Sequence, residues 1–202
     1  MHISSEIDAA LEALANGDVI AMPTETLYGL AVDATNDAAV EKLYQLKGRG
    51  EEKPFSLQVH GVEEMWRFAE WSETTEKLAT AFMPGPLTLI LERREGANIS
   101  RAINVRSHTL GIRIPDHPVA QAVLQHYPNP LAVPSANKTD QPPALTKTEV
   151  ENIFGDDVAV YLDNTQDPLN EPSTVVWVQG AKIKIIRAGV ITEDQINKVL
   201  AA

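Results

Sequence analysis

Apolar residues at helical spacing alternate along the chain with short apolar runs that turn residues interrupt. The first helical pattern covers residues 7–14, begins behind Ser4 and Ser5, which can cap a first turn, and ends at Asn16-Gly17. The apolar run of residues 19–22 follows directly. It is too short for a helix, and it predicts a buried strand.

Residues 36–47 form the clearest helical pattern of the chain. Asn36 can act as the N-cap, Asp37 puts an acidic side chain in the first turn, and Lys47 puts a basic one in the last turn. Gly48 follows as a stop signal, because glycine readily adopts the left-handed conformation that ends many helices. The pattern therefore predicts a helix with Lys47 at its end.

The same alternation continues to the C-terminus. Strands are predicted at residues 55–59, 87–91, 110–114, 131–133, 158–162, 173–178 and 182–186. Helices are predicted at residues 62–69, 74–82 and 117–126, and two more begin at the capping boxes that open with Thr146 and Thr192. Because helices interleave with strands but the last strands follow one another directly, we expect an α/β fold. It consists of a twisted mixed sheet with antiparallel pairs and with helices packed on it, in one domain over residues 1–202.

Composition and charge argue against several classes of function, among them strong RNA binding, metal binding and insertion into a membrane. The 202 residues are 44% hydrophobic, and 28 acidic against 17 basic side chains leave a net charge of −11. Such a chain repels phosphate backbones overall, so a nucleotide must meet a local cluster of Lys and Arg, and RNA binding can only be weak. The sequence has no cysteine, and its five histidines, His2 among them, lack metal-ligand spacing, so we predict no metal site in the protein. No apolar run approaches 18 residues, which predicts a cytoplasmic protein without a membrane segment.

Known nucleotide and hydrolase motifs are absent, since the chain has no GxxxxGK[ST], GxGxxG or GxSxG. Polar clusters instead follow predicted strands or helices. Residues 23–30 place Thr24, Thr26 and Glu25 in one short turn, which can hold a small ligand or simply cap the turn. Lys47 and Arg49 flank a glycine, an arrangement that suits a triphosphate and also suits a helix end.

Further along the chain, three more clusters carry polar groups. Arg113 interrupts an apolar strand on the face opposite Ile112, which favours a surface position over contact with an anion. Ser135 and Asn137 follow a short strand, where they can bind phosphate oxygens or form a local turn, and spacing does not decide between the two. Ser173-Thr174 opens a strand and Arg187 closes the last one; each alone is typical of a surface position.

Taken in order, these clusters resemble the YrdC-like family, the threonylcarbamoyl-AMP synthases of tRNA modification, in its short single-domain form. The matching segments are PTETLYGL, the helix ending in KGR with KPFSLQV after it, PGPLTLIL, GIRIPDHPVA, PSAN, PSTVV and IIRAG. They span residues 23–189, which is nearly the whole chain. Seven segments in the family's order make the resemblance specific.

The resemblance implies a nucleotidyltransferase, an L-threonylcarbamoyladenylate synthase that joins L-threonine, bicarbonate and ATP and releases pyrophosphate. Mg²⁺ would enter with ATP, and separate tRNA threonylcarbamoyl transferase proteins would receive the product. The family's fold is an α/β domain with a concave basic ligand pocket. No general base stands out in the motifs, so the catalytic residues stay unassigned.

Residue roles follow from the same motif match. The implied ATP contacts are Lys47, Arg49, Ser135, Asn137 and Arg187. The implied threonine contacts are Thr26, Thr88, Ser173 and, as a carboxylate clamp, Arg113. The implied pocket wall comprises Thr24, Tyr28 and Gln58.

The chain departs from the family pattern at a few positions. Gln58 stands where some members carry a histidine, Thr139-Asp140 replaces Ser-Gly, and Ala188 replaces a proline. The chain ends at Ala202, before the additional domain of longer members. A non-catalytic paralogue that binds nucleotide or RNA is the alternative, and a carbamoyl-transfer domain of a larger maturation enzyme is a third hypothesis; the KxR and SxN pairs favour the synthase.

Overall fold

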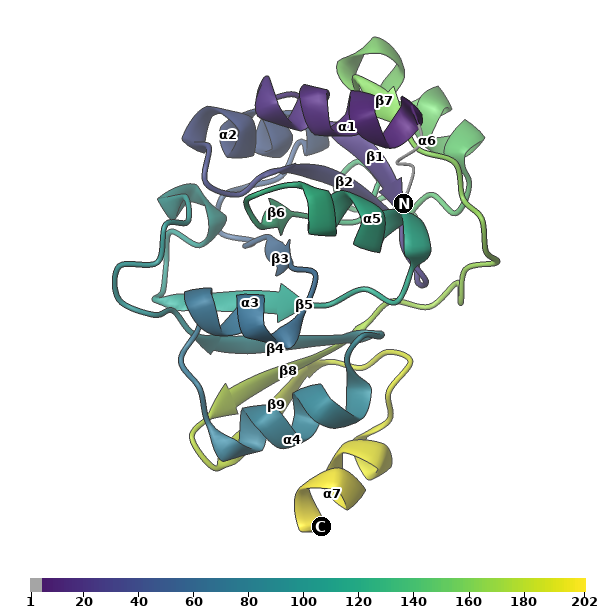
Figure 1. The fold of residues 1–202 in the computed structure, drawn as a ribbon. Coiled ribbons are helices and arrows are strands. Elements are labelled where there is room, and N and C mark those ends of the chain that lie inside the picture. Colours follow the sequence, from purple (N-terminus) through teal and green to yellow (C-terminus); the bar gives the residue numbers. More distant parts are fainter. Residues whose placement is uncertain (1–4) are drawn as a thin grey trace.

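A computed structural model describes residues 5–202, so the predicted cap at Ser4 and the histidine His2 lie outside the described residues. One nine-stranded mixed sheet runs through the molecule in the order β7-β1-β2-β6-β3-β5-β4-β8-β9 (Figure 1). The strands are β1 (Ile20–Pro23), β2 (Tyr28–Asp33), β3 (Ser56–Gln58), β4 (Leu87–Glu92), β5 (Thr109–Arg113), β6 (Leu131–Ala132), β7 (Val160–Tyr161), β8 (Thr174–Gln179) and β9 (Lys182–Arg187). The predicted fold class, a twisted mixed sheet with helices packed on it, is confirmed.

Helices cover the sheet along its length. They are α1 (Ser5–Ala15), α2 (Asp37–Lys47), α3 (Val62–Phe68), α4 (Glu73–Phe82), α5 (Pro118–His126), α6 (Lys147–Phe154) and α7 (Glu193–Ala201), with short 3₁₀ turns at Arg101–Ile103 and Gly155–Asp157. The capping boxes predicted at Thr146 and Thr192 are both present, at the starts of α6 and α7. Among the helices of residues 5–202, none combines the length and the apolar character that a bilayer span requires.

Strand β2 is missing from the sequence prediction, which treats residues 23–30 as a single polar turn. In the structure only residues 24–27 turn, and Tyr28 already pairs with Pro23 in an antiparallel hairpin. Every residue of β2 is buried, because Leu30 and Val32 face one core cluster and Ala31 faces the other. A strand buried on both faces shows no alternation of apolar and polar residues, which explains why the pattern fails there.

Helix α2 forms as its sequence predicts and carries a site residue to the sheet. The side chain of Asn36 accepts a hydrogen bond from the backbone N–H of Ala39 at 3.2 Å. Gly48 ends the helix with φ near 60°, in the left-handed region. Val40 and Leu43 pack into the core, and the same helix therefore buries Lys47 at its C-terminal turn.

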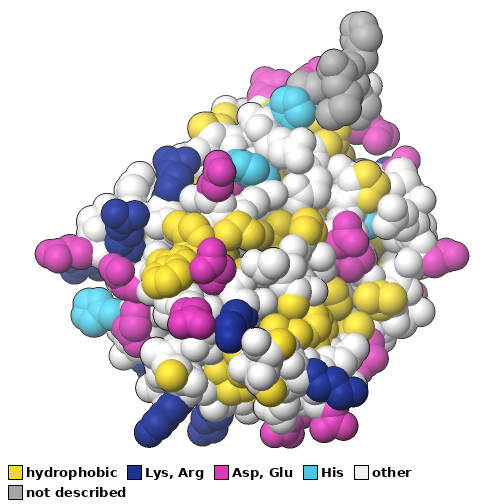
Figure 2. Space-filling model, turned by 60° about the horizontal axis from the view of Figure 1, so that its bottom comes forward, with side chains coloured by type: hydrophobic (Ala, Val, Ile, Leu, Met, Phe, Trp, Pro, Cys, Tyr) yellow, Lys and Arg dark blue, Asp and Glu magenta, His cyan; other side chains and the backbone are white. Residues whose placement is uncertain are grey.

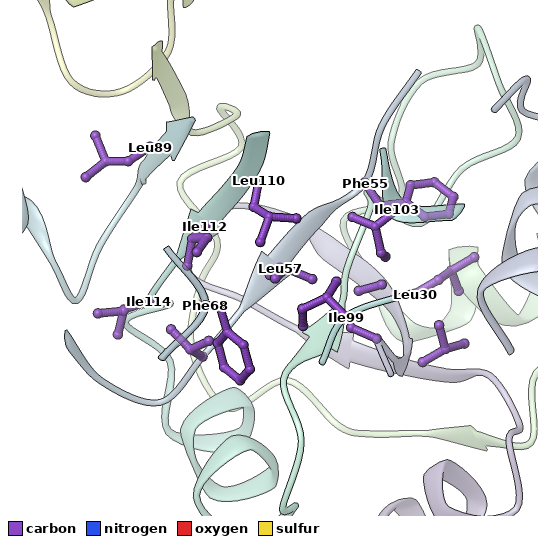
Figure 3. Packing of buried hydrophobic residues seen from close by; sticks show 14 of the residues in the cluster. Leu30, Phe55, Leu57, Phe68, Leu89, Ile99, Ile103, Leu110, Ile112 and Ile114 are labelled. Carbon is purple, nitrogen blue, oxygen red and sulfur yellow. The ribbon is translucent and has the colours of Figure 1, made fainter. Parts of the chain in front are cut away.

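Strands β3, β5, β4 and β8 separate the hydrophobic core from a cavity. Successive side chains of a strand point to opposite faces, and Leu57, Ile112 and Leu89 belong to the core cluster shown in Figure 3. Helices α3 and α4 also contribute apolar residues to this cluster. The alternate residues of these strands line the cavity on the other face. One face of the sheet is therefore the floor of the cavity.

The acidic residues do not gather into one patch on the face shown in Figure 2. Side chains of both charges are spread there around a band of exposed hydrophobic residues. The net charge of −11 is therefore not concentrated in one place on this face.

Candidate active site

A cavity of about 650 Å³ lies over the floor made by β3, β4, β5 and β8. The turn after β1, the segment after α2, the loop after β6 and the residues before β8 form its walls. Ten of the twelve predicted site residues line it: Thr24, Thr26, Tyr28, Arg49, Gln58, Thr88, Arg113, Ser135, Ser173 and Arg187. The concave pocket expected from the resemblance is thus present.

The cavity is basic although the protein is acidic. Arg49, Arg113, Arg187 and Lys53 line it, and Glu52 is the carboxylate among the described lining residues. Cations that converge in a concave, partly desolvated site attract anions more strongly than the same charges on an open surface. The electrostatics therefore favour an anionic ligand.

Arg113 is buried, so the surface position favoured from its strand pattern is wrong. Its side chain is 9% exposed, and Nη2 donates to Glu25 Oε1 at 2.6 Å and to Thr26 Oγ1 at 2.8 Å. The other oxygen of Glu25 accepts from the backbone N–H of Asp116. An arginine inside the protein needs such an opposite charge, and Glu25 supplies it from 88 residues away. The Nε–H of Arg113 is buried and has no hydrogen-bond partner.

The turn that carries Thr26 is held by its own hydroxyl groups. Thr24 Oγ1 donates to the carbonyl of Leu27 at 2.6 Å and accepts from the backbone N–H groups of residues 26 and 27. The two threonine hydroxyl oxygens lie 3.0 Å apart. Thr24 therefore caps the turn, as one of the two readings expects, and Thr26 lines the cavity beside Arg113.

A second hydroxyl pair lies on the other side of the floor. Thr88 Oγ1 and Ser173 Oγ are 2.9 Å apart, joined across the parallel pair of β4 and the start of β8. Arg187 donates to the carbonyl of Ser173 from Nε and Nη2, and Nη2 also donates to Ser173 Oγ at 3.0 Å. Partial burial, with Arg113 and Arg49 nearby, lowers the pKa of Arg187. An arginine predicted for ATP therefore contacts a serine predicted for threonine.

Lys47 and Asn137 are not among the described residues that line the cavity. Lys47 is 1% exposed, and its ammonium donates to the carbonyl of Ser135 at 2.5 Å and to that of Asn137 at 2.6 Å. Asn137 accepts from Ser135 Oγ and donates to the carbonyls of Lys138 and Gln141. Of the two readings left open for residues 135 and 137, these contacts are those of a local turn. Burial, with Arg49 and Lys138 nearby, lowers the pKa of Lys47 to about 7.

Arg49 is held in place before any ligand arrives. Its Nε donates to the carbonyl of Lys53 at 2.8 Å and its Nη2 to that of Pro54 at 3.1 Å. The guanidinium lies over the ring of Phe55, 5.4 Å from its centroid. These contacts leave the remaining N–H groups of Arg49 available to an anion. Partial burial lowers the pKa of Arg49, which stays charged at neutral pH.

Tyr28 and Gln58 complete the wall in different ways. Tyr28 donates from its hydroxyl to the carbonyl of Leu162 at 3.1 Å, and burial raises its pKa to about 12, so it is a neutral wall residue. Gln58 is 4% exposed and lines the cavity, yet its Oε1 has no hydrogen-bond partner. Buried polar atoms are normally paired, so this buried oxygen is an exception to that rule.

Several lining residues carry no role implied by the motif match, among them Lys53, Glu52 and Asn170. Lys53 also forms an exposed ion pair with Asp140 at 3.6 Å. The sequence signal for Lys53 is the Lys-Pro pair that follows KGR. Asn170 has no such signal, because it lies in a loop with φ near 57°. Within residues 5–202, no three His, Cys, Asp or Glu side chains come close enough to hold a metal ion.

The chain is similar in sequence to known proteins of one family. The Sua5/YciO/YrdC family model, described as "Telomere recombination", matches residues 12–189. Threonylcarbamoyl-AMP synthase of Mus musculus is 39% identical over 146 residues, which are 72% of this chain and 51% of the mouse protein. A putative threonylcarbamoyl-AMP synthase of Mycobacterium tuberculosis is 32% identical over 200 residues, 98% of this chain and 90% of that protein.

A solved structure extends the comparison to the fold. The crystal structure of Pyrococcus abyssi Sua5 complexed with L-threonine superposes with a TM-score of 0.90 at 30% identity, over 96% of this chain and 56% of that chain. The present chain thus spans about half the length of the mouse synthase and of that Sua5. The resemblance seen in the motifs is confirmed, and the protein belongs to the Sua5/YciO/YrdC family.

Proposed function

We propose that this protein is an L-threonylcarbamoyladenylate synthase, a nucleotidyltransferase that joins L-threonine, bicarbonate and ATP and releases pyrophosphate. The observation that carries the proposal is the cavity floor itself. There Arg113 lines the same 650 Å³ cavity as the Thr88–Ser173 hydroxyl pair and two further arginines, Arg49 and Arg187. The hydroxyl groups suit a small hydroxy amino acid, and the arginines suit a polyphosphate bound beside it.

The threonine half of the reaction falls to the hydroxyl-rich part of the cavity. A carboxylate would accept from the guanidinium of Arg113, which lines the cavity and is held in place by its ion pair with Glu25. Thr26, Thr88 and Ser173 offer hydroxyl groups within the same wall and floor. These groups would bind and orient the amino acid so that its nitrogen faces bicarbonate.

The ATP half of the reaction needs cations. A carbamate oxygen attacks the α-phosphorus while the bond to pyrophosphate breaks, so negative charge accumulates on the transferred group and the leaving group. Arg49 and Arg187 are already oriented by backbone carbonyls, and preorganised donors stabilise such charge without a reorganisation cost. Ser135 adds a hydroxyl at the end of the loop that Lys47 holds.

Mg²⁺ fits this site as a companion of ATP. The ion prefers oxygen ligands and keeps several waters, so phosphate oxygens supply most of its coordination. Glu52 is the described lining carboxylate that could add a ligand. In the proposed role the ion would neutralise part of the phosphate charge.

We also propose that the product passes to separate tRNA threonylcarbamoyl transferase proteins. The protein would carry out this reaction in the cytoplasm.

The test is pyrophosphate release by the purified protein from Mg-ATP, with threonine and bicarbonate each omitted in turn. Release that requires both is the expected result. Gln125→Leu, an exposed change on α5, serves as the control for preparation and stability. If ATP binds but no pyrophosphate is released, or if its release does not depend on threonine, the proposal is refuted. The alternative of a non-catalytic paralogue that binds nucleotide would then be favoured.

A further inference from the structure

Arg49 packs against a pair of buried aromatic rings. The rings of Tyr44, in α2, and Phe55, just before β3, are stacked, with their centroids 3.9 Å apart and an angle of 20° between their planes. The guanidinium of Arg49 lies over the ring of Phe55, 5.4 Å from its centroid. Both aromatic residues are more than nine-tenths buried, so Phe55 presents a fixed surface to the guanidinium.

The carbonyl of Lys53 joins the side chains of Tyr44 and Arg49 a second time. It accepts from Arg49 Nε at 2.8 Å and from the hydroxyl of Tyr44 at 3.3 Å. The same hydroxyl lies 3.4 Å from the carbonyl of Ile103, which also accepts from the backbone N–H of Phe55. The backbone N–H of Arg49, in turn, donates to the carbonyl of Tyr44 at 3.0 Å. Tyr44 therefore acts on Arg49 through its ring, its hydroxyl and its carbonyl.

These contacts hold Arg49 without neutralising its charge. The carboxylates of Glu52 and Asp140 attract that charge, yet the ion pairs formed among residues 5–202 do not include Arg49. A carboxylate partner would occupy the N–H groups that a phosphate needs. Phe55 instead contacts the guanidinium, and two backbone carbonyls use only Nε and one N–H of Nη2. The N–H groups that remain on Nη1 and Nη2 form a fork that suits a phosphate.

We propose that Tyr44 and Phe55 are positioning residues for Arg49, and that they fix its guanidinium toward a triphosphate and away from the neighbouring carboxylates. The proposal rests on the proposed function, in which Arg49 contacts ATP. A guanidinium that has lost the ring could turn toward Glu52 or Asp140, and the affinity for polyphosphate would fall. Because Tyr44 and Phe55 act through Arg49, the effects of replacing them should disappear once Arg49 itself is replaced.

The experiment is a double-mutant cycle read by calorimetry with Mg-ATP and with inorganic pyrophosphate. Phe55→Leu removes the ring and keeps an apolar side chain, Tyr44→Phe removes only the hydroxyl, and each is made in the native protein and in Arg49→Lys. We expect Phe55→Leu to lower the affinity for both ligands about threefold to tenfold, the size of a cation–π contact. We expect Tyr44→Phe to lower it about twofold to fivefold, through the lost hydrogen bond to the Lys53 carbonyl.

In the Arg49→Lys protein, both effects should shrink to less than about twofold, because independent changes add and coupled ones do not. This step is needed because Phe55 also lines the cavity, and a change in cavity shape would persist without Arg49. In turnover, the KM for Mg-ATP should rise while the KM for threonine stays the same.

Phe68→Leu is the matched control. Phe68 is also buried in the core, and the guanidinium of Arg67 lies over its ring, 5.6 Å from the centroid. Phe68 is not among the described residues that line the cavity. We therefore expect Phe68→Leu to lower the melting temperature as Phe55→Leu does, but to leave pyrophosphate affinity unchanged.

Three results would overturn the proposal: losses of equal size with Arg49 and with Lys at position 49, an equal loss in Phe68→Leu, or unchanged affinity in both Phe55→Leu and Tyr44→Phe. Arg49→Lys that binds pyrophosphate as the native protein does would overturn it too, since Arg49 would then contact no phosphate. Calorimetry needs no turnover, so it separates this proposal from the synthase reaction. Coupled losses of affinity in a protein that releases no pyrophosphate from ATP would refute the synthase and support the positioning role.

Discussion

The ammonium of Lys47 lies 2.6 Å from the carbonyl oxygen of Asn137 and 3.3 Å from its side-chain oxygen. Two residues that the motif match assigns to ATP are therefore partners of each other. Through these bonds and the one to Ser135, the last residue of α2 determines the path of the loop after β6. A phosphate group that contacts Lys47 would have to compete with the three oxygen atoms of Ser135 and Asn137 to which the ammonium already donates.

Lys47→Met should destabilise the protein as well as weaken ATP binding. The variant keeps the length of the side chain but removes the donor, which leaves buried carbonyls unpaired at a cost of about 1–3 kcal/mol. Urea unfolding measures the stability, and calorimetry measures the ATP affinity. Reduced ATP affinity with native stability would mean that Lys47 acts as a direct ligand and not through the loop.

The pH dependence of stability should reveal the buried lysine. The pKa of Lys47 is lowered from 10.5 to about 7 in the folded protein, so the unfolded chain binds more protons between these two pH values. Stability contributed by this group is therefore gained as the pH rises through that window, by at most about 1.4 kcal/mol per pH unit. Unfolding by urea at pH 7 to 9.5 should show the native protein gaining stability relative to Lys47→Met. Parallel pH profiles would contradict the lowered pKa.

Arg113→Ala should raise the KM for threonine much more than the KM for ATP. The loss of a charge-assisted contact to a carboxylate costs about 1.5–3 kcal/mol, which corresponds to roughly 10-fold to 100-fold in threonine affinity. Steady-state kinetics with each substrate varied in turn gives both constants. Equal increases in the two KM values would instead point to a folding defect caused by the unpaired carboxylate of Glu25.

Gly189→Ala should disturb the Ser173 end of the floor. A Cβ at Gly189 would lie 2.2 Å from the carbonyl oxygen of Pro172 and 2.7 Å from the backbone of Ser173. Backbone atoms cannot yield as a flexible side chain does, so we expect a loss of about 1–3 kcal/mol in stability and weaker threonine binding. Gly61→Ala is the matched control, because a Cβ there meets nothing within 4 Å. If both variants melt alike, the backbone contact at Gly189 does not matter.

Local chemistry made much of the fold predictable. The cap at Asn36, the stop at Gly48 and the two capping boxes act within a few residues of the chain, and the structure confirms each of them. Strand positions followed from short apolar runs for the same reason. Strand β2 was not predicted, because residues 28–33 are buried on both faces and begin inside a polar motif.

Motif order was enough to identify the family and ten of the lining residues, since the chain carries these side chains at fixed places along its strands and loops. Which of them face a ligand depends on partners far away in the chain. Arg113 is buried beside Glu25, which is 88 residues away in the sequence, and Lys47 donates a hydrogen bond to Asn137, which is 90 residues away. Sequence patterns report the conformational preferences of neighbouring residues, whereas burial and pairing of charges arise only when distant segments pack together.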